Sequence, residues 1–282
     1  MRDLADRILS LDRRFIFILI GLVILIPLLY PIGLPVRVSA EVQRVYDYIE
    51  RLPEGARIVI SLDYDPASKP ELQPMTVAFL RHAFRRKLRL IGLTLWPTGT
   101  SMAESELTRI GQEFGKVYGQ DYVFLGYAPG EANAILSMGQ DLYAAFPTDY
   151  YGTPTPTIPV LNAIRSLQDV AYVFSLSAGF PGLDTWYVYG KEKYGFELGG
   201  GSVAVSVPKF YPLLNTGQIQ GLLGGLRGAA EYETLLDMPG KARAGMDAQS
   251  ATHFLIIGLI VVCNGLYFLS GRAGRRSGRR GS

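Results

Sequence analysis

Two long apolar segments, one near each end, constrain this chain more than any other feature of its sequence. Residues 15–36 form a run of 22 residues without a charge, and a helix needs about 20 apolar residues to cross a bilayer. Residues 254–269 add a second run of 16, which reaches a full span if its polar flanks lie in the membrane interface. We therefore predict transmembrane helices at residues 15–36 and 251–271.

Each apolar segment has one alternative interpretation. The first is compatible with a cleaved signal peptide, for which the SA pair at residues 39–40 is the one hint of a cleavage site. Its apolar stretch exceeds a typical signal-peptide core, and Pro27, Pro31 and Pro35 make its outer end irregular. The second segment could instead be a buried core helix, but its strongly basic flank favours a membrane span.

Positive charge next to both segments predicts how the chain crosses the membrane. Arg13 and Arg14 precede the first segment, and a tail without acidic residues follows the second. Lysine and arginine accumulate on the cytoplasmic side of membrane spans. We therefore predict cytoplasmic ends at residues 1–14 and 272–282, and an extracytoplasmic domain at residues 37–250 of an inner or plasma membrane protein. The tail arginines are Arg272, Arg275, Arg276, Arg279 and Arg280.

The charge balance argues against a nucleic-acid partner. The basic tail could serve as a nucleic-acid arm, but it supplies most of the net charge of +3, and residues 37–249 are slightly acidic. The single cysteine, Cys263, lies in the second span, so no intrachain disulfide can form. The central domain must therefore be held by an apolar core, for which about 200 residues are ample.

Apolar runs alternate with helical patterns through the central domain, which predicts α/β architecture. Parallel strands joined by helical crossovers form sheets covered on both faces, and their strands have a continuous apolar character. We expect a three-layer Rossmann- or flavodoxin-like domain with about five mainly parallel strands. The expected strands are 57–62, 88–95, 121–126, 170–176 and 202–207; the expected helices are 40–52, 71–86, 102–118, 131–142, 160–167 and 217–236.

A candidate ligand pocket follows from this architecture. Ligands of such sheets bind at the carboxyl ends of the strands, near the point where the strand order reverses. The residues expected there are polar or aromatic, which suits a small-molecule pocket. They are Asp63, Asp65, Thr98, Tyr127, Glu131, Ser175 and Ser177.

The segment LDYDPAS, at residues 62–68, resembles the first motif of the haloacid-dehalogenase superfamily, an apolar strand ending in Asp-x-Asp. The resemblance implies that Asp63 is a nucleophile and Asp65 an acid/base, with bridging magnesium and a second-motif hydroxyl from Ser175 or Ser177. The chain departs from that pattern at Pro66, and no acidic pair follows the last expected strand. The alternative is that both aspartates form an Asx-type turn that caps the next helix.

The sequence predicts no catalytic residue, metal or cofactor. His82 and His253 have no cysteine or carboxylate at metal-ligand spacing. No GxGxxG motif opens the first crossover, and no P-loop is present. The Gly-rich stretch at 195–202 precedes an expected strand and is interpreted as a flexible turn.

Glycines in the last expected helix of the domain predict an interaction surface. Interior glycine costs a helix up to about 1 kcal/mol, and small residues four positions apart allow another backbone to approach closely. The candidate interface residues are Gly221, Gly224, Gly225 and Gly228. The alternative is close packing on the domain's own sheet. Aromatic residues of DTWYVYGKEKYG, including Trp186, are expected to add exposed partner surface.

These patterns favour a non-catalytic, membrane-anchored subunit of an envelope or transport assembly. Its expected partners are the lipid bilayer, other membrane subunits and further copies of itself. One alternative is an extracytoplasmic ligand-binding or sensor module that signals through a partner. A second alternative is a membrane-tethered, metal-dependent hydrolase that uses Asp63 and Asp65.

Overall fold

The structure, a computed structural model, describes the backbone of residues 12–277 and the side chains up to residue 268. It divides into two units. Pro35–Arg243 forms an α/β domain, and the segments on either side of it contribute the second unit. Arg279 and Arg280 lie outside the described residues, as does most of the predicted cytoplasmic segment 1–14.

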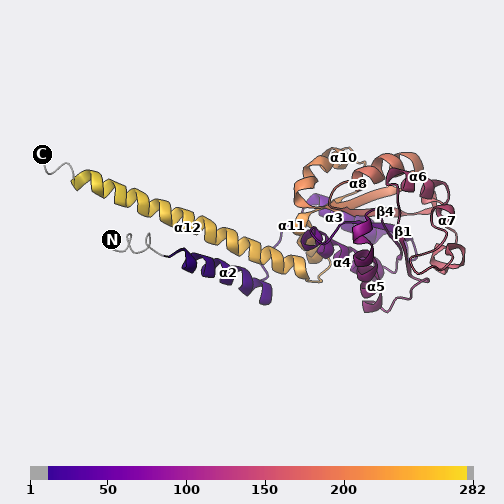
Figure 1. Cartoon of the computed structure of the whole chain (residues 1–282), viewed down its shortest axis with the longest axis horizontal. Helices are drawn as coiled ribbons and strands as arrows, with labels where there is room; N and C mark the ends of the chain where they lie inside the picture. Colours follow the sequence, from indigo (N-terminus) through magenta and orange to yellow (C-terminus); the bar gives the residue numbers. More distant parts are fainter. Residues whose placement is uncertain (1–11, 278–282) are drawn as a thin grey trace. The chain divides into compact units, whose positions relative to one another are not determined.

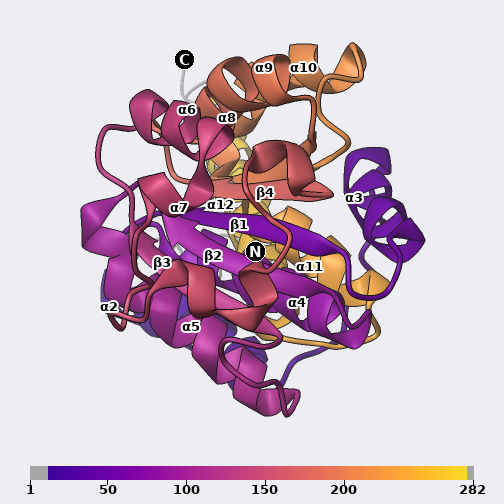
Figure 2. The ribbon, with the colours of Figure 1, turned by 90° about the vertical axis from the view of Figure 1, so that its right-hand side faces the viewer.

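The domain is built on a six-stranded parallel sheet in the order β3-β2-β1-β4-β5-β6. This is the doubly wound order, in which the direction of strand addition reverses between β1 and β4. Figure 2 labels the neighbouring strands β3, β2, β1 and β4. The prediction of a parallel α/β fold is confirmed, with six strands rather than five. The strands are β1 Arg57–Asp63, β2 Arg89–Thr94, β3 Tyr122–Tyr127, β4 Tyr172–Ser177, β5 Glu197–Ser202 and β6 Leu222–Gly224.

Helices cover both faces of the sheet. One face carries α3 Ala40–Arg51, α4 Lys69–Arg85, α5 Thr100–Glu113 and α11 Gly225–Leu235. The other carries α6 Ala132–Gln140, α7 Leu142–Ala145, α8 Leu183–Trp186 and α10 Tyr211–Asn215, around a continuous apolar core. A π-helix, Tyr187–Lys191, and α9 Glu192–Tyr194 follow α8. The expected helix at 160–167 is replaced by the 3-10 turns Pro159–Leu161 and Leu167–Asp169.

The fifth strand lies earlier in the chain than predicted. The Gly-rich stretch expected to be a turn is β5 itself, and the expected strand 202–207 falls largely in a 3-10 helix, Ala204–Phe210. Glycine is required in β5 because a Cβ at Gly199 would overlap the Tyr172 hydroxyl and one at Gly200 the Ser175 carbonyl. The prediction was wrong because this requirement comes from the neighbouring strand β4.

The glycine-bearing helix also begins later than predicted. It starts at Gly225, and the preceding residues form the edge strand β6. A Cβ at Gly221 would meet Val45 of α3, and one at Gly228 would meet the backbone of Leu223. Those at Gly224 and Gly225 would meet Val207 and Ala204. The close approaches that suggested an interface are therefore made inside the domain.

The terminal unit contains the apolar helices α2 Arg13–Leu29 and α12 Lys241–Ser277 (Figure 1). Among the described residues, the segment Lys241–Phe268 of α12 is the one helix that is long and apolar enough to cross a membrane. The prediction of two such helices is therefore met by one. With 17 residues, α2 is about 25 Å long, which is short of a hydrocarbon core of about 30 Å. Residues 31–39 form no helix, because Pro31 and Pro35 restrict the backbone there.

Candidate functional site

Asp63 lies at the reversal point of the sheet. It ends β1 and is aligned with Ser177, which ends the neighbouring β4, while Ser61 is aligned with Ser175. Alternate residues of a strand share a face, so all four side chains are on the face covered by α8. All four are completely buried.

The Asp63 carboxylate is held by hydrogen bonds from two strands. The Ser61 hydroxyl donates to Oδ2 at 2.6 Å, and the Leu95 backbone N–H donates to Oδ1 at 2.6 Å. The Thr94 hydroxyl lies 3.5 Å from Oδ1. Burial raises the pKa of Asp63 to about 7, although the hydrogen bonds lower it. The carboxyl therefore changes charge near neutral pH.

Large side chains and a loop fill the space above this carboxylate. Trp186 of α8 is completely buried, and its indole N–H faces Asp63 without reaching hydrogen-bond geometry. The Trp96 indole donates to the Pro181 carbonyl at 3.0 Å, and a Cβ at Gly182 would lie 2.2 Å from the Ser177 hydroxyl oxygen. The crevice where doubly wound proteins usually bind ligands is thus occupied by the chain itself.

Several polar groups in this filled crevice lack partners. Among the described residues, nothing hydrogen-bonds to the hydroxyls of Ser175 and Ser177 or to the indole N–H of Trp186. A buried polar group without a partner costs about 1–3 kcal/mol. The Asp63 cluster, defined as Ser61, Asp63, Ser175, Ser177 and Trp186, is therefore only partly satisfied.

Asp65 serves a different purpose from Asp63. Its Oδ1 accepts from the backbone N–H groups of Ala67 at 3.1 Å and Ser68 at 3.2 Å. This is an Asx turn that leads into α4. Since the two aspartates accept from different backbone segments, they do not converge on one point as the resemblance to haloacid dehalogenases requires. No three His, Cys, Asp or Glu residues in the described part of the chain form a group that could hold a metal.

Three other predicted pocket residues, Thr98, Tyr127 and Glu131, are exposed, whereas Asp63 is completely buried. Thr98 is in the 3-10 turn Pro97–Gly99 after β2, and Tyr127 ends β3 with 39% of its surface exposed. Glu131 is exposed at the start of α6 with a positive φ of 51°. The structure therefore brings together Asp63, Ser175 and Ser177. Strand alternation could have added Ser61 to them, whereas the sequence gives no signal for Trp186, which was expected to be exposed.

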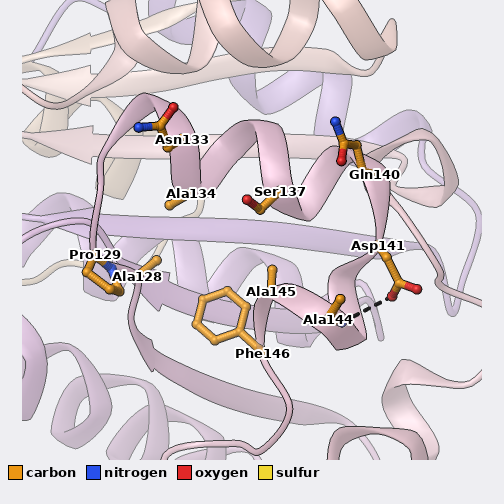
Figure 3. A pocket seen from close by; sticks show the side chains of 10 residues that line it. All are labelled: Ala128, Pro129, Asn133, Ala134, Ser137, Gln140, Asp141, Ala144, Ala145 and Phe146. Atoms are coloured by element: carbon orange, nitrogen blue, oxygen red, sulfur yellow. Dashed lines mark hydrogen bonds between the residues drawn. The ribbon is translucent and has the colours of Figure 1, made fainter.

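An open groove lies nearby, between α6 and α7 at the end of β3 (Figure 3). Its volume is about 400 Å³. Figure 3 shows Ala134 and Ser137 on the side of α6 toward Phe146, with Gln140 near the far end. The one carboxylate of the lining is Asp141, which accepts from the backbone N–H of Ala144 and from the Arg165 guanidinium at 3.0 Å. The hydrogen bond from Ala144 holds the pKa of Asp141 below its usual value. The groups left for a ligand are neutral amides and hydroxyls.

A second buried polar cluster lies on the opposite face of the sheet, around His82 of α4. Nδ1 is 2.6 Å from the Tyr232 hydroxyl and Nε2 is 2.9 Å from Glu50 Oε1. The ring stacks on Tyr46 at 4.7 Å between centroids. This geometry fits a neutral imidazole that donates to Glu50 and accepts from Tyr232. Burial lowers the pKa of His82 to about 4.

Comparison with known proteins gives no family. No protein-family description matches the chain, and no curated protein matches it. Among solved structures, a trehalose-6-phosphate synthase, OtsA, is similar with a TM-score of 0.30 and 9% sequence identity. The match covers 85% of this chain and 47% of that chain, so this chain spans about half the length of the synthase. A likeness of this size has no bearing on function.

Proposed function

We propose that this protein is a membrane-anchored, non-catalytic subunit of an envelope or transport assembly, with its α/β domain presented for binding. The main support for a non-catalytic role is that the chain's own residues fill the crevice at the point where the strand order reverses. A catalytic carboxylate must come within hydrogen-bond reach of its substrate, whereas Asp63 is completely buried beneath Trp186.

The terminal unit supports the membrane anchor. Large apolar side chains cover the outside of α12 and α2; for example, Phe254 is 74% and Phe17 is 66% exposed. Exposed surface of this kind is stable in lipid and unfavourable in water. The Asp247 carboxylate accepts from the backbone N–H groups of Gly33 at 2.8 Å and Leu34 at 3.0 Å, which ties the chain after α2 to the start of α12. In the proposed hairpin α2 crosses beside α12, and because its 17 residues are shorter than the hydrocarbon core the bilayer must thin around it. The termini are then cytoplasmic and the domain extracytoplasmic.

The groove between α6 and α7 favours a second candidate function, a ligand-binding or sensor module. Its neutral lining of Asn133, Ser137 and Gln140 suits an uncharged polar ligand. Because the charge of Asp141 is already compensated by Arg165, a phosphate or a metal ion has no evident partner among the lining residues. A sensor of this kind would signal through a separate membrane subunit.

Cysteine labelling tests the topology. In a Cys263→Ser background, an impermeant maleimide applied to intact cells should label Thr157→Cys, which is exposed on the domain, and should spare Ser277→Cys in the basic tail. Both sites should react after the membrane is permeabilised. Labelling of Ser277→Cys alone in intact cells would overturn the proposed orientation.

Substitution of the two aspartates tests the non-catalytic role. Asp63→Asn and Asp65→Asn, each in the full chain, should preserve the ability to complement a deletion strain. Magnesium should leave the melting temperature unchanged, whereas a native magnesium site would raise it by mass action. A magnesium-dependent rise that Asp63→Asn abolishes would establish the hydrolase in place of the subunit.

A further inference from the structure

One side of α12 is covered by α2. Leu255, Leu259 and Leu266 of α12 are partly buried and repeat at helical spacing. The facing stripe of α2 is Ile16, Ile20, Val23 and Pro27, all partly or fully buried. A shallow groove lined by residues of both helices, including Ile24 and Thr252, runs between them. This side of α12 therefore has its partner within the chain.

The opposite side of α12 carries a second apolar stripe that α2 leaves uncovered. Phe254, Ile257, Val261 and Phe268 are 74%, 57%, 65% and 66% exposed. Together with Asn264 they are separated by three, four, three and four residues. This alternation is the a/d spacing of a left-handed helix pair, so we name these five residues the α12 seam.

Asn264 places one amide in the middle of this apolar stripe. Its Nδ2 donates to the Ile260 carbonyl of the same helix at 2.9 Å, and it has no other hydrogen-bond partner among the described residues. An amide has two N–H donors and a carbonyl acceptor, so one N–H and the carbonyl of Asn264 remain unpaired, which is costly in hydrocarbon. A single asparagine in an a/d seam is also the device that sets register and oligomeric state in helix pairs.

We propose that the α12 seam pairs with the same seam of a second copy of this chain. The proposal rests on the membrane insertion proposed above. Copies of one protein insert in the same direction, so their α12 helices run parallel and equal residues lie at equal depth. Asn264 of one copy then faces Asn264 of the other, and each amide donates to the other's carbonyl in a two-fold arrangement.

Two neighbouring valines provide a matched test. In a Cys263→Ser background, Val261→Cys lies on the seam, whereas Val262→Cys lies at the same depth on the side of Leu259 and Leu266. Mild oxidation of native membranes should convert Val261→Cys to a disulfide-linked dimer and leave Val262→Cys monomeric. Equal cross-linking of the two variants, or cross-linking of Val261→Cys to a different protein, would overturn the proposal.

Asn264 is tested by its effect on affinity. In bicelles, energy transfer between labelled full-length copies should show a dimer dissociation constant about five- to thirtyfold higher for Asn264→Leu, given measured interhelical hydrogen bonds in membranes. Asn264→Gln should restore most of the affinity. An unchanged dissociation constant for Asn264→Leu would show that the amide is not part of the interface.

Alkaline carbonate extraction of the same membranes separates the two possible failures. Release of the wild-type chain into the soluble fraction would contradict the proposed membrane anchor. Retention in the membrane without a preference for Val261→Cys over Val262→Cys would contradict the seam alone.

Discussion

The two buried polar clusters of the domain differ in how many of their polar groups are hydrogen-bonded. On one face of the sheet, His82 uses both ring nitrogens, one with Tyr232 and one with Glu50. On the other, Asp63 accepts from Ser61 and Leu95, while the neighbouring serine hydroxyls at 175 and 177 have no described partner. One cluster is a closed network and the other is open.

The difference indicates which region is structural. A fully satisfied buried network fixes the elements that contribute to it, and the His82 cluster joins α3, α4 and α11. A partly satisfied network is easier to rearrange, because new partners compensate groups that are already unpaired. We therefore expect substitutions in the His82 cluster to cost more stability than those in the Asp63 cluster.

The largest expected effect is that of His82→Ala. It leaves the Tyr232 hydroxyl buried without a partner and removes the ring that stacks on Tyr46. We expect a loss of roughly 3–5 kcal/mol in the free energy of unfolding. Denaturant unfolding of the full chain in detergent, followed by the fluorescence of Trp96 and Trp186, measures it. A loss below about 1 kcal/mol would place the stabilising network elsewhere.

A smaller effect is expected in the pH dependence of stability. The folded state keeps His82 neutral down to about pH 4, whereas the unfolded residue takes up its proton near 6.5, so this group loses stability as the pH falls from 6.5 to 4. Asp63 takes up a proton near pH 7 when folded and near 3.8 when unfolded, so it gains stability as the pH falls through that window. The two groups therefore change the free energy of unfolding in opposite directions, and in the wild-type chain their combined contribution should vary little with pH.

Asp63→Asn removes the titrating carboxyl, so the pH dependence that comes from His82 is no longer opposed. Between pH 6.5 and 4 the variant should lose about 3 kcal/mol relative to its stability at neutral pH, since each unit of pKa difference corresponds to about 1.4 kcal/mol. Unfolding midpoints at a series of pH values, with wild type measured alongside, check this. Parallel pH profiles for the variant and wild type would show that Asp63 is not the opposing group.

The smallest expected effect separates two serines in the Asp63 cluster. Ser61→Ala removes a 2.6 Å hydrogen bond to the carboxylate and should cost about 1 kcal/mol. Ser177→Ala removes a buried hydroxyl without a described partner, so it should leave stability unchanged or raise it by about 1 kcal/mol, because the cost of an unpaired buried polar group is removed. Paired melting curves are sufficient, and a loss of stability for Ser177→Ala would mean that its hydroxyl is bonded in solution.

Local pattern alone determined much of this protein. The alternation of apolar runs with helical spacing was enough to predict a parallel α/β domain, because burial on both faces of such a sheet imposes that pattern. The terminal apolar runs likewise indicated helices, and the Asx turn at Asp65 followed from the residues around it. These features depend on neighbours within a few positions of the chain.

Tertiary structure decided the features that depend on distant residues. Strand β5 could not be distinguished from a flexible turn, since its glycines are required by Tyr172 and Ser175 on another strand. His82 meets a tyrosine 150 positions away, and Trp186 is buried over Asp63 although its segment has the composition of an exposed surface. Such contacts form only when the chain folds, and each partner carries no local trace of the other.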